Sequence, residues 1–291
     1  QQLVVASDTL VEGVHFPATA TAKQIGTRAL CVNLSDMAAM GAQPRWFTLA
    51  LTLPEEKANS DWLADFSAGI AEIAEQFDIA LVGGDTTSGP LTVSLTLLGE
   101  VPPAESLQRS GAQVGDSVFV TGNLADGAAG LKWISSINNI CNDSDRLLQR
   151  FYSPQPQIKT GIQLRGIASA CIDISDGLVA DLGHICQSSA VAATIYIEQL
   201  PIAADVRKLD ADNCINWALF GGDEYQLCFT VSADNLSTLE QWIDSGELHA
   251  SKIGTIDKAA KAVNSSTNLV TVLDCNNNPI AVNKQGYDHF G

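Results

Sequence analysis

Apolar residues in the first hundred positions recur with two different spacings, one typical of helices and one typical of strands. Helical spacing predicts two amphipathic helices, at 21–40 and 61–77. Short β-rich runs predict four strands, at 3–6, 46–53, 80–82 and 91–101. Strands and helices therefore mix within this part of the chain.

A polar stretch at 102–116, which begins with two prolines, interrupts this pattern, and we place a domain boundary within it. The two predicted domains are residues 1–104 and residues 105–291. Beyond the boundary, the pattern predicts strands at 117–122, 168–174, 192–197 and 226–231 and helices at 124–134 and 177–187. Because strands and helices do not alternate as strict βαβ units, both domains are predicted to be of the α+β class.

The composition excludes several classes of protein. Hydrophobic residues make up 46% of the 291 positions, so the chain can bury a large core and is not expected to be disordered. The formal charge of −17 argues against nucleic acid and against an anionic membrane surface as partners, because both attract clustered Lys and Arg. No run of 18 apolar residues is present, so no membrane-spanning helix is expected.

The cysteines and the first residue add two expectations. The seven cysteines form no CxxC pair and leave an odd number, which is typical of reduced thiols in the cytoplasm. The expected location is therefore cytoplasmic. The chain opens on a strand-like run without an initiating Met, so we expect further residues to precede Gln1.

The residues best suited to chemistry are acids in five clusters. All but one cluster follow the end of a predicted apolar run, and the exception lies late in a predicted helix. The acids are Asp8, Asp36, Asp85, Asp173 with Asp176, and Asp223 with Glu224. Ser and Thr hydroxyls flank most of them, and hard cations such as Mg²⁺ take oxygen ligands. Two of the clusters follow a Gly-Gly pair, whose accessible backbone N–H groups suit phosphate oxygens.

A purely structural interpretation of these acids is also open. Asp favours turns and helix N-termini, so any single cluster can be explained without a ligand, and Asp176 is expected to cap a helix that begins at Gly177. As a set, however, the carboxylates would repel one another by about 4 kcal/mol per contact pair if they met in space. Few bases lie near them in the sequence, and Arg109 is the main exception. Bound divalent cations with a polyphosphate would allow such a cluster to form.

The motifs of several other catalytic chemistries are absent from the sequence. There is no GxxxxGK[ST] loop, no GxGxxG after a strand, no GxSxG and no HExxH. The four histidines are dispersed, and the spacing of Cys and His offers no zinc site. Among the histidines, His15 lies close to Asp8 in the sequence and is a candidate for contact with a substrate.

Six segments resemble one family, thiamine-monophosphate kinase, in the same order along nearly the whole chain. They are DTLVEGVHF (8–16), VNLSDMAAMGAQP (32–44), LVGGDTTSGPL (81–91), LQRSGAQVGDSVFVTG (107–122), IDISDGLVADLGH (172–184) and GYDHF (286–290). The resemblance implies the two-domain fold of the aminoimidazole ribonucleotide synthetase-like superfamily, with an N-terminal domain that forms a barrel across a homodimer. It also implies ATP and thiamine monophosphate in the cleft between the domains, together with several Mg²⁺ ions.

The resemblance further implies roles for individual residues. The implied metal-binding set is Ser7, Asp8, Asp36, Asp85, Asp173 and Asp176, and its catalytic members are Asp85, Asp173 and Asp176. The implied ATP contacts are Gly84, Asp85, Arg109 and Ser175. The implied substrate contacts are His15, Asp223 and Tyr287.

Three departures from the family pattern bear on these roles. The family reads GGEDYE where this chain has GGDEYQ at 221–226, so the substrate acid falls on Asp223 by position, with Glu224 as the alternative. Ala6 stands where a hydroxyl residue is common, which removes one metal contact. A GDDAA-like segment, which in the family supplies further metal ligands upstream of the first strand, is not in this sequence.

The implied reaction is direct transfer of the γ-phosphoryl group of ATP to thiamine monophosphate, which gives thiamine diphosphate and ADP without a phospho-enzyme. The nucleophile is a phosphate oxygen that is already ionised near neutral pH, so no general base is required. Two alternatives stay open. One is another ATP-dependent synthetase of the superfamily, of the selenophosphate or aminoimidazole ribonucleotide type, and the other is a non-catalytic module that binds a metal ion or a metabolite.

Overall fold

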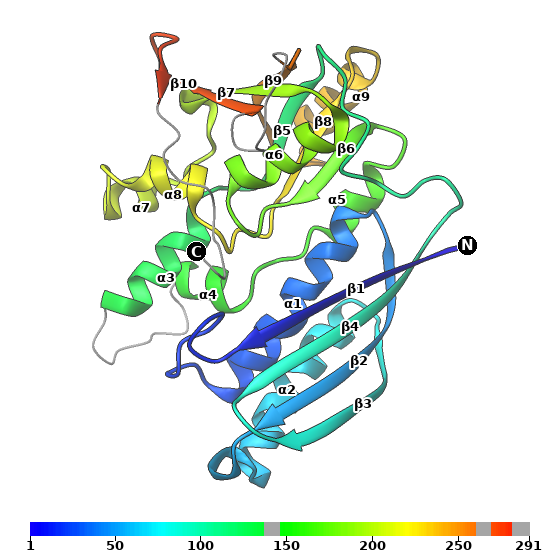
Figure 1. Cartoon of the computed structure of the whole chain (residues 1–291), viewed down its shortest axis with the longest axis vertical. Coiled ribbons are helices and arrows are strands. Elements are labelled where there is room, and N and C mark those ends of the chain that lie inside the picture. The colour runs from blue at the N-terminus through cyan, green and yellow to red at the C-terminus, as the bar shows by residue number, and fades with distance from the viewer. Residues whose placement is uncertain (137–145, 260–268, 281–291) are drawn as a thin grey trace.

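The computed structural model describes residues 1–136, 146–259 and 269–280. Within these ranges the chain forms two β-sheets that pack against helices (Figure 1). The first sheet has four strands in the order β1-β4-β2-β3, and the second has seven in the order β11-β10-β7-β9-β5-β8-β6. Because β1 to β4 all precede β5 in the chain, the two sheets belong to successive halves of the sequence.

The first sheet combines antiparallel and parallel pairing. Its strands are β1 (Gln2–Val11), β2 (Gln43–Leu53), β3 (Ala80–Ser88) and β4 (Thr92–Val101). Strand β4 pairs antiparallel with β1 and with β2, and β3 pairs parallel with β2. Alternate residues of β4 are buried, because one face of the sheet packs against helices. All nine residues of β3 are exposed, so this strand is an uncovered edge of the sheet in a single chain.

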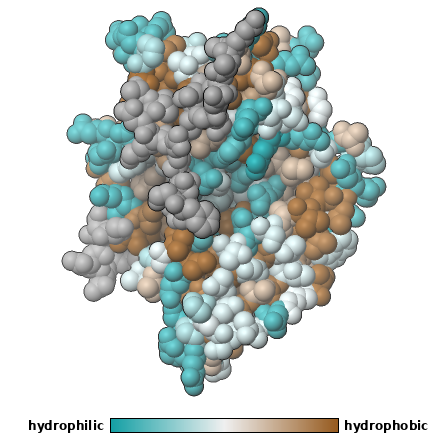
Figure 2. Space-filling view, viewed as in Figure 1, coloured by the Kyte–Doolittle hydropathy of each residue, from teal (hydrophilic) through white to brown (hydrophobic). Residues whose placement is uncertain are grey.

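Large apolar side chains are exposed on both edge strands of the first sheet. Leu3 and Val5 on β1, and Leu81 and Val82 on β3, are each more than half exposed. Figure 2 shows apolar surface at the right of the view, over the part of the sheet where β1 begins. Uncovered strand edges that carry apolar side chains are typical of a sheet that pairs with another chain.

Helix α1 (Ala22–Ala39) lies between the first sheet and the second half of the chain (Figure 1). It begins with a capping box. The Thr21 hydroxyl accepts a hydrogen bond from the Gln24 amide at 3.2 Å, and the Gln24 side chain accepts one from the Thr21 amide at 2.9 Å. These two bonds satisfy amides that would otherwise lack partners in the first turn, and so they fix the point where the helix starts.

The two sides of α1 have different neighbours. One side packs closely against α2 (Ser60–Gln76), since a Cβ atom on Gly69 would lie 2.2 Å from the Lys23 carbonyl oxygen. The other side packs against α5 (Ile158–Gln163) and β6 (Ala168–Asp173). Polar residues of α1 are therefore held at the junction between the two halves of the chain.

The second sheet and its helices form the second half of the chain. Its strands are β5 (Ser117–Thr121), β6, β7 (Ala192–Tyr196), β8 (Leu227–Val231), β9 (Ala250–Asp257), β10 (Val270–Leu273) and β11 (Pro279–Ile280). The helices are α3 (Asp126–Ser136), α4 (Arg146–Tyr152), α5, α6 (Leu178–Ser189), α7 (Ala204–Leu209), α8 (Cys214–Phe220) and α9 (Ala233–Asp244). Every residue of the interior strands β5 and β8 is buried, so the core of this half extends around them.

The structure corrects the predicted surroundings of two acids. Asp8 and Asp85 were expected to follow the ends of strands, and this prediction is wrong because both lie inside strands. Hydrogen-bonded pairing continues past each residue, with Asp8 opposite Leu95 on β4 and Asp85 opposite Ala50 on β2. Strands β1 and β3 are therefore longer than their apolar runs.

The predicted cap of helix α6 is also wrong. The residue before the helix is Gly177, at φ 114°, and the Asp176 side chain does not cap it. Instead, Asp181 in the first turn of the helix accepts hydrogen bonds from the backbone amides of Ser175 and Asp176, both at 3.1 Å.

No helix in the described ranges is long and apolar enough to cross a membrane. Six of the cysteines lie in these ranges and all six are free thiols, five of them buried and one, Cys275, exposed. The buried thiols pack as small apolar groups, and burial raises the pKa of Cys31 and Cys186 to about 12.

Candidate active site

A cavity of about 940 Å³ lies where α1 and β1 meet the loops of the second half of the chain. Eight residues singled out from the sequence line it. They are Asp8, His15, Asp36, Arg109, Asp173, Ser175, Asp176 and Asp223. The fold thus gathers acids from four of the five sequence clusters around one cavity.

Three other predicted site residues, Ser7, Gly84 and Asp85, do not line this cavity in a single chain. Ser7 faces the opposite side of the sheet from Asp8, because successive residues of a strand alternate, and its hydroxyl donates to a carbonyl oxygen of β4 at 3.1 Å. Gly84 and Asp85 lie in the exposed edge strand β3. Tyr287 lies outside the described residues.

Helix α1 contributes one row of side chains to the cavity wall. Arg28, Val32 and Asp36 are spaced four residues apart, so they lie one above another on the same helix face. Strand β1 is held beside this face because the amide of Asp8 donates to the Asn33 side chain at 3.1 Å. The helix therefore places an arginine at one end of the row and an acid at the other.

The acids at the Asp36 end of this row disfavour each other's charge. Burial, together with the carboxylates of Asp173 and Asp8, raises the pKa of Asp36 to about 8, although Arg109 opposes the rise. Burial also raises the pKa of Asp173, against a hydrogen bond that it accepts from the Ser35 hydroxyl at 2.7 Å. For Asp8, burial is again the main cause of a raised pKa. Three carboxyl groups whose negative charge is only partly offset by neighbouring positive groups or hydrogen bonds thus line the cavity.

These oxygen donors fit a hard divalent cation such as Mg²⁺ better than a softer metal. In the described residues, however, no three His, Cys, Asp or Glu side chains converge closely enough to form a metal centre by themselves. Mg²⁺ is usually held by one or two carboxylates together with substrate phosphates and water. The arrangement is therefore suited to a cation that arrives with a phosphate ligand.

Two loops of the second half of the chain also line the cavity and are joined through their backbones. The amide of Asp223 donates to the Ser175 carbonyl oxygen at 3.0 Å, and the amide of Tyr225 donates to that of Ile174 at 2.8 Å. This close approach requires glycine at 222, where a Cβ atom would lie 2.4 Å from the Ser175 carbonyl oxygen. The GGDEY and ISDG motifs, about 45 positions apart in the sequence, are therefore held side by side.

The two neighbouring acids of the GGDEY motif have different surroundings. Asp223 lines the cavity and forms an ion pair with Arg28. Glu224 is only 2% exposed, does not line the cavity, and has no hydrogen-bond partner for either oxygen among the described residues. Of the two acids left open by the sequence, Asp223 is thus the one that can reach a molecule in the cavity.

Sequence reasoning missed further residues of the cavity wall, among them Arg28, Asp181, Trp217 and Tyr225. A signal was available for Arg28, because it is a charged residue within a stretch of α1 that is otherwise nearly all small or apolar. The sequence signal for Asp181 was weaker, because it is only an acid in the first turn of a predicted helix. The two aromatic residues have no distinguishing pattern in the sequence.

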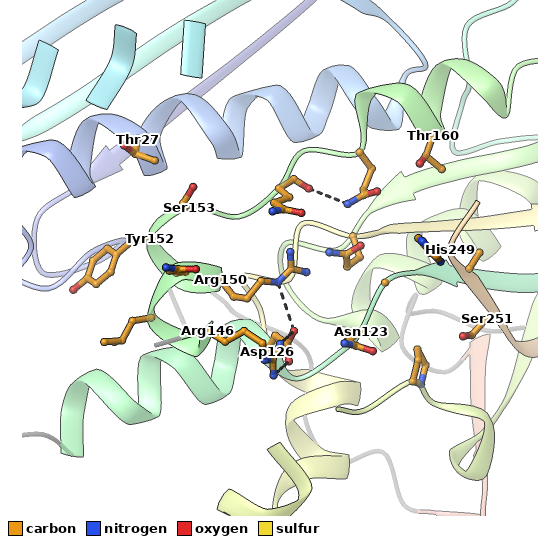
Figure 3. Close-up of a pocket in the computed structure, with 18 of the residues that line it drawn as sticks. Thr27, Asn123, Asp126, Arg146, Arg150, Tyr152, Ser153, Thr160, His249 and Ser251 are labelled. Atoms are coloured by element: carbon orange, nitrogen blue, oxygen red, sulfur yellow. Dashed lines mark hydrogen bonds and ion pairs between the residues drawn. The ribbon is translucent and has the colours of Figure 1, made fainter. Parts of the chain in front are cut away.

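A second, larger cavity of about 1130 Å³ lies along the face of α1 that carries Thr27 (Figure 3). Arg150 and Asp126 point into the middle of this view, and Arg146 pairs with Asp126 at 2.5 and 2.9 Å. None of the predicted site residues in the part of the chain that the structure describes lines it. Gln226 lines this larger cavity, whereas Asp223 and Tyr225 line the smaller one, so the segment 223–226 separates the two cavities.

Comparison with known proteins identifies the family of this fold. Residues 1–101 match the model for the N-terminal domain of AIR synthase related proteins, and residues 113–263 match the model for their C-terminal domain. The thiamine-monophosphate kinase of Salmonella typhimurium is 40% identical over 293 residues, which are 100% of this chain and 87% of that protein. The enzyme of Bacillus subtilis is 34% identical over 296 residues, covering 99% and 88%. This chain belongs to the thiamine-monophosphate kinase family.

Solved structures of this kinase family have the same fold. The thiamine-monophosphate kinase of Stenotrophomonas maltophilia superposes with a TM-score of 0.84 at 44% identity, covering 93% of this chain and 85% of that one. AaThiL complexed with AMPPCP and TMP superposes with a TM-score of 0.85 at 31% identity, covering 99% and 87%. The expected two-domain fold of mixed helices and strands is thus confirmed. The hydrogenase maturation protein HypE, at 19% identity and a TM-score of 0.76, shares the fold alone.

Proposed function

We propose that this member of the thiamine-monophosphate kinase family transfers the γ-phosphoryl group of ATP directly to thiamine monophosphate. The products are thiamine diphosphate and ADP, and no phospho-enzyme forms. The observation that carries the proposal is the gathering of Asp8, Asp36, Asp173 and Asp176 around one cavity in a chain of this family. The relatives' names support the substrate, and the complex of AaThiL with AMPPCP and TMP supports binding of both substrates together.

The residues of the cavity suit a reaction between two anions. The acceptor phosphate is ionised near neutral pH, so the chain need not supply a base. Arg109 lines the cavity and would hold the nucleotide, and the backbone around Ser175 would orient it. His15 accepts a hydrogen bond from the Val11 amide on Nδ1 at 3.0 Å, so the proton of its neutral ring is on Nε2. That nitrogen is suited to donate to a phosphate oxygen of thiamine monophosphate.

We assign the metal-binding role to the cavity acids Asp8, Asp36, Asp173 and Asp176. Mg²⁺ bound there would neutralise phosphate charge and stabilise the transferring group. The raised pKa values of Asp8, Asp36 and Asp173 support this role. They are caused mainly by burial and to a smaller extent by neighbouring carboxylates, and a bound cation would favour the charged forms.

We also propose that two copies of the chain pair through the edges of their first sheets to form a barrel. The exposed edge strand β3 and the exposed apolar side chains of β1 and β3 support this arrangement. In such a homodimer, Gly84 and Asp85 would serve the nucleotide and metal site of the partner copy. The domain boundary at 104/105, between the end of β4 and the start of β5, stays a prediction.

Incubation of the protein with ATP, MgCl₂ and thiamine monophosphate tests the proposed reaction. We expect equal amounts of ADP and thiamine diphosphate, measured by chromatography. Asp176→Asn should lower kcat by about two orders of magnitude or more with an unchanged melting temperature, since removal of a group that stabilises the transition state has effects of this size. Binding of both substrates without turnover by the wild type would instead favour a non-catalytic module.

A further inference from the structure

Arg28 is a buried cation in the wall of the cavity, and it has no role in the proposed phosphoryl transfer. It is 1% exposed, in the middle of helix α1. Burying a charged group costs free energy unless partners satisfy its charge and its hydrogen bonds. The partners of Arg28 therefore indicate what the residue does.

Each nitrogen of the Arg28 guanidinium has its own acceptor. Nε donates to the His15 carbonyl oxygen at 3.1 Å, Nη1 donates to the Phe151 carbonyl oxygen at 2.5 Å, and Nη2 donates to Oδ1 of Asp223. The guanidinium carbon also lies 4.1 Å from the ring centre of Phe151 and 5.7 Å from that of Tyr225. A planar group held by three hydrogen bonds and in contact with two aromatic rings has one orientation.

These contacts connect two residues that are expected to bind substrate. His15 and Asp223 are 208 positions apart in the sequence, and Arg28 touches the backbone of one and the side chain of the other. Burial alone would lower the pKa of Arg28, but the neighbouring Asp223 and Tyr225 outweigh this and raise it above its usual value. Arg28 therefore stays charged and offsets the charge of Asp223.

The carboxylate of Asp223 is held by one of its two oxygens. Oδ1 accepts from Arg28 and from the Tyr225 hydroxyl, the latter at 3.2 Å. The side chain is 26% exposed and lines the cavity, and Oδ2 has no hydrogen-bond donor among the described residues. Asp223 therefore presents a fixed acceptor atom to a molecule in the cavity.

The chemistry of thiamine monophosphate offers one main partner for such an acceptor. An ionised carboxylate only accepts hydrogen bonds. In this substrate the thiazolium ring carries no N–H, the phosphate is anionic near neutral pH, and the amino group on the pyrimidine ring carries the N–H donors. Because Arg28 already offsets the charge of Asp223, recognition of a neutral donor is favoured over recognition of a cation.

We infer that Arg28 is a positioning residue for substrate selection: it fixes Oδ1 of Asp223 so that Oδ2 accepts a hydrogen bond from the amino group of the substrate pyrimidine. The inference rests on the proposed function, because it assumes thiamine monophosphate in this cavity. It adds a role that neither phosphoryl transfer nor metal binding requires.

The test compares Arg28→Lys and Asp223→Asn with Arg165→Lys as a matched control. Arg165 donates to the Gly41 carbonyl oxygen at 2.7 Å and does not line the cavity. Lysine keeps the charge of Arg28 but cannot make three directed contacts. We expect KM for thiamine monophosphate to rise about ten- to hundredfold in both cavity variants, as for loss of a hydrogen bond to a charged group. KM for ATP should stay unchanged, and the control should resemble the wild type.

A second measurement separates positioning from a merely structural role. It uses thiamine monophosphate with the pyrimidine amino group replaced by hydrogen. The wild type should discriminate against this analogue at least tenfold in kcat/KM, and both cavity variants should lose most of the discrimination. Asp223→Asn is expected to fold even if a change at Arg28 does not, because asparagine keeps an oxygen that can accept the hydrogen bond from Arg28 and the side chain at this position is partly exposed.

Three outcomes are distinguishable. Loss of discrimination in the folded cavity variants supports the inference. Full discrimination against the analogue by Asp223→Asn would overturn the inference while leaving the kinase reaction in place. So would equal increases in KM for thiamine monophosphate and for ATP in the cavity variants. Absence of turnover by the wild type itself would overturn the proposed function, and the inference with it.

Discussion

Glu224 is a carboxyl group that folding places out of reach of water. Neither of its oxygens accepts a hydrogen bond of normal geometry in the described part of the chain, although the backbone amide of Gly127 lies close enough to favour its charged form. Burial, with a smaller contribution from Asp126, raises its pKa from 4.5 to about 8, although the backbone amide of Gly127 and the charge of Arg150 oppose the rise. Between these two pH values, the folded protein keeps a proton on Glu224 that the unfolded chain has released.

The free energy of unfolding should therefore fall as the pH rises from about 4.5 to about 8, because the folded state binds the extra proton over this range. The contribution of Glu224 is at most about 1.4 kcal/mol per pH unit. Glu224→Gln has nearly the same shape and does not titrate, so its advantage in stability over the wild type should grow across this range and level off above it. Urea unfolding at several pH values measures both proteins, and parallel curves would contradict the expectation.

Asp36 titrates in the cavity, with a pKa of about 8 in the free protein. A cation bound beside it would favour the carboxylate and lower that pKa. Binding of Mg²⁺ with an ATP analogue near pH 7 should then release protons, which titration calorimetry detects as a difference in heat between buffers of different ionisation enthalpy. Asp36→Asn should remove most of this difference. Equal heats for the wild type in all buffers would argue against a cation at Asp36.

At the scale of elements, the edge strand β3 decides how the first sheet can associate. Val82 on β3 is 58% exposed, and Val114, in the segment between the two sheets, is 60% exposed. If β3 pairs with another copy, Val82→Arg should convert the dimer to a monomer, because it buries an unpaired charge in the interface. The matched change Val114→Arg should leave the dimer intact. Sedimentation of the three proteins measures this, and equal behaviour of the two variants would count against pairing through β3.

Periodicity predicted helices α1 and α2 and the strands β5 to β8, but it missed several elements of the second sheet and its helices, among them α5, α9 and β9. Helix α1 was predictable in both type and extent, because it combines helical spacing with Thr21 as cap and Gly41 beyond its end. Helix α5 (Ile158–Gln163) has only six residues, too few to show a helical period. Strand β3 was predicted too short, since Gly83, Gly84 and Asp85 are typical of turns and only pairing with β2 keeps them extended.

At the scale of the whole molecule, the proposed homodimer has a direct kinetic test. Asp85→Asn and Asp176→Asn should each be nearly inactive. If Asp85 serves the partner's site, a mixed dimer contains one site with both changes and one with neither. Random exchange of the two variants should then restore about a quarter of the wild-type activity. No recovery after exchange, verified by mass spectrometry of the mixed dimers, would place Asp85 in the site of its own chain.

The sequence predicted a set of acids for the candidate site, but not how their side chains are arranged or which residues they contact. Asp8, Asp36 and Asp173 could be found because each stands beside hydroxyl residues with few bases nearby. The sequence placed the substrate acid at Asp223 by position but left Glu224 as the alternative, because the two acids are neighbours in one motif and only packing of the loop determines which side chain is buried. Long-range contacts such as that of Arg28 with Asp223 leave no periodic trace in the sequence.

The segment that separates the two cavities limits how either can be re-engineered. Asp223 and Tyr225 line the smaller cavity, while Gln226 lines the larger one. Gln226 is itself fixed, with its amide oxygen oriented to accept from Arg150 at 2.5 Å. A designer who enlarges the second cavity by trimming Gln226 would loosen the same short stretch of backbone that aims Asp223. Altered selectivity in the first cavity would then arise as a side effect, from a substitution that never meets the substrate.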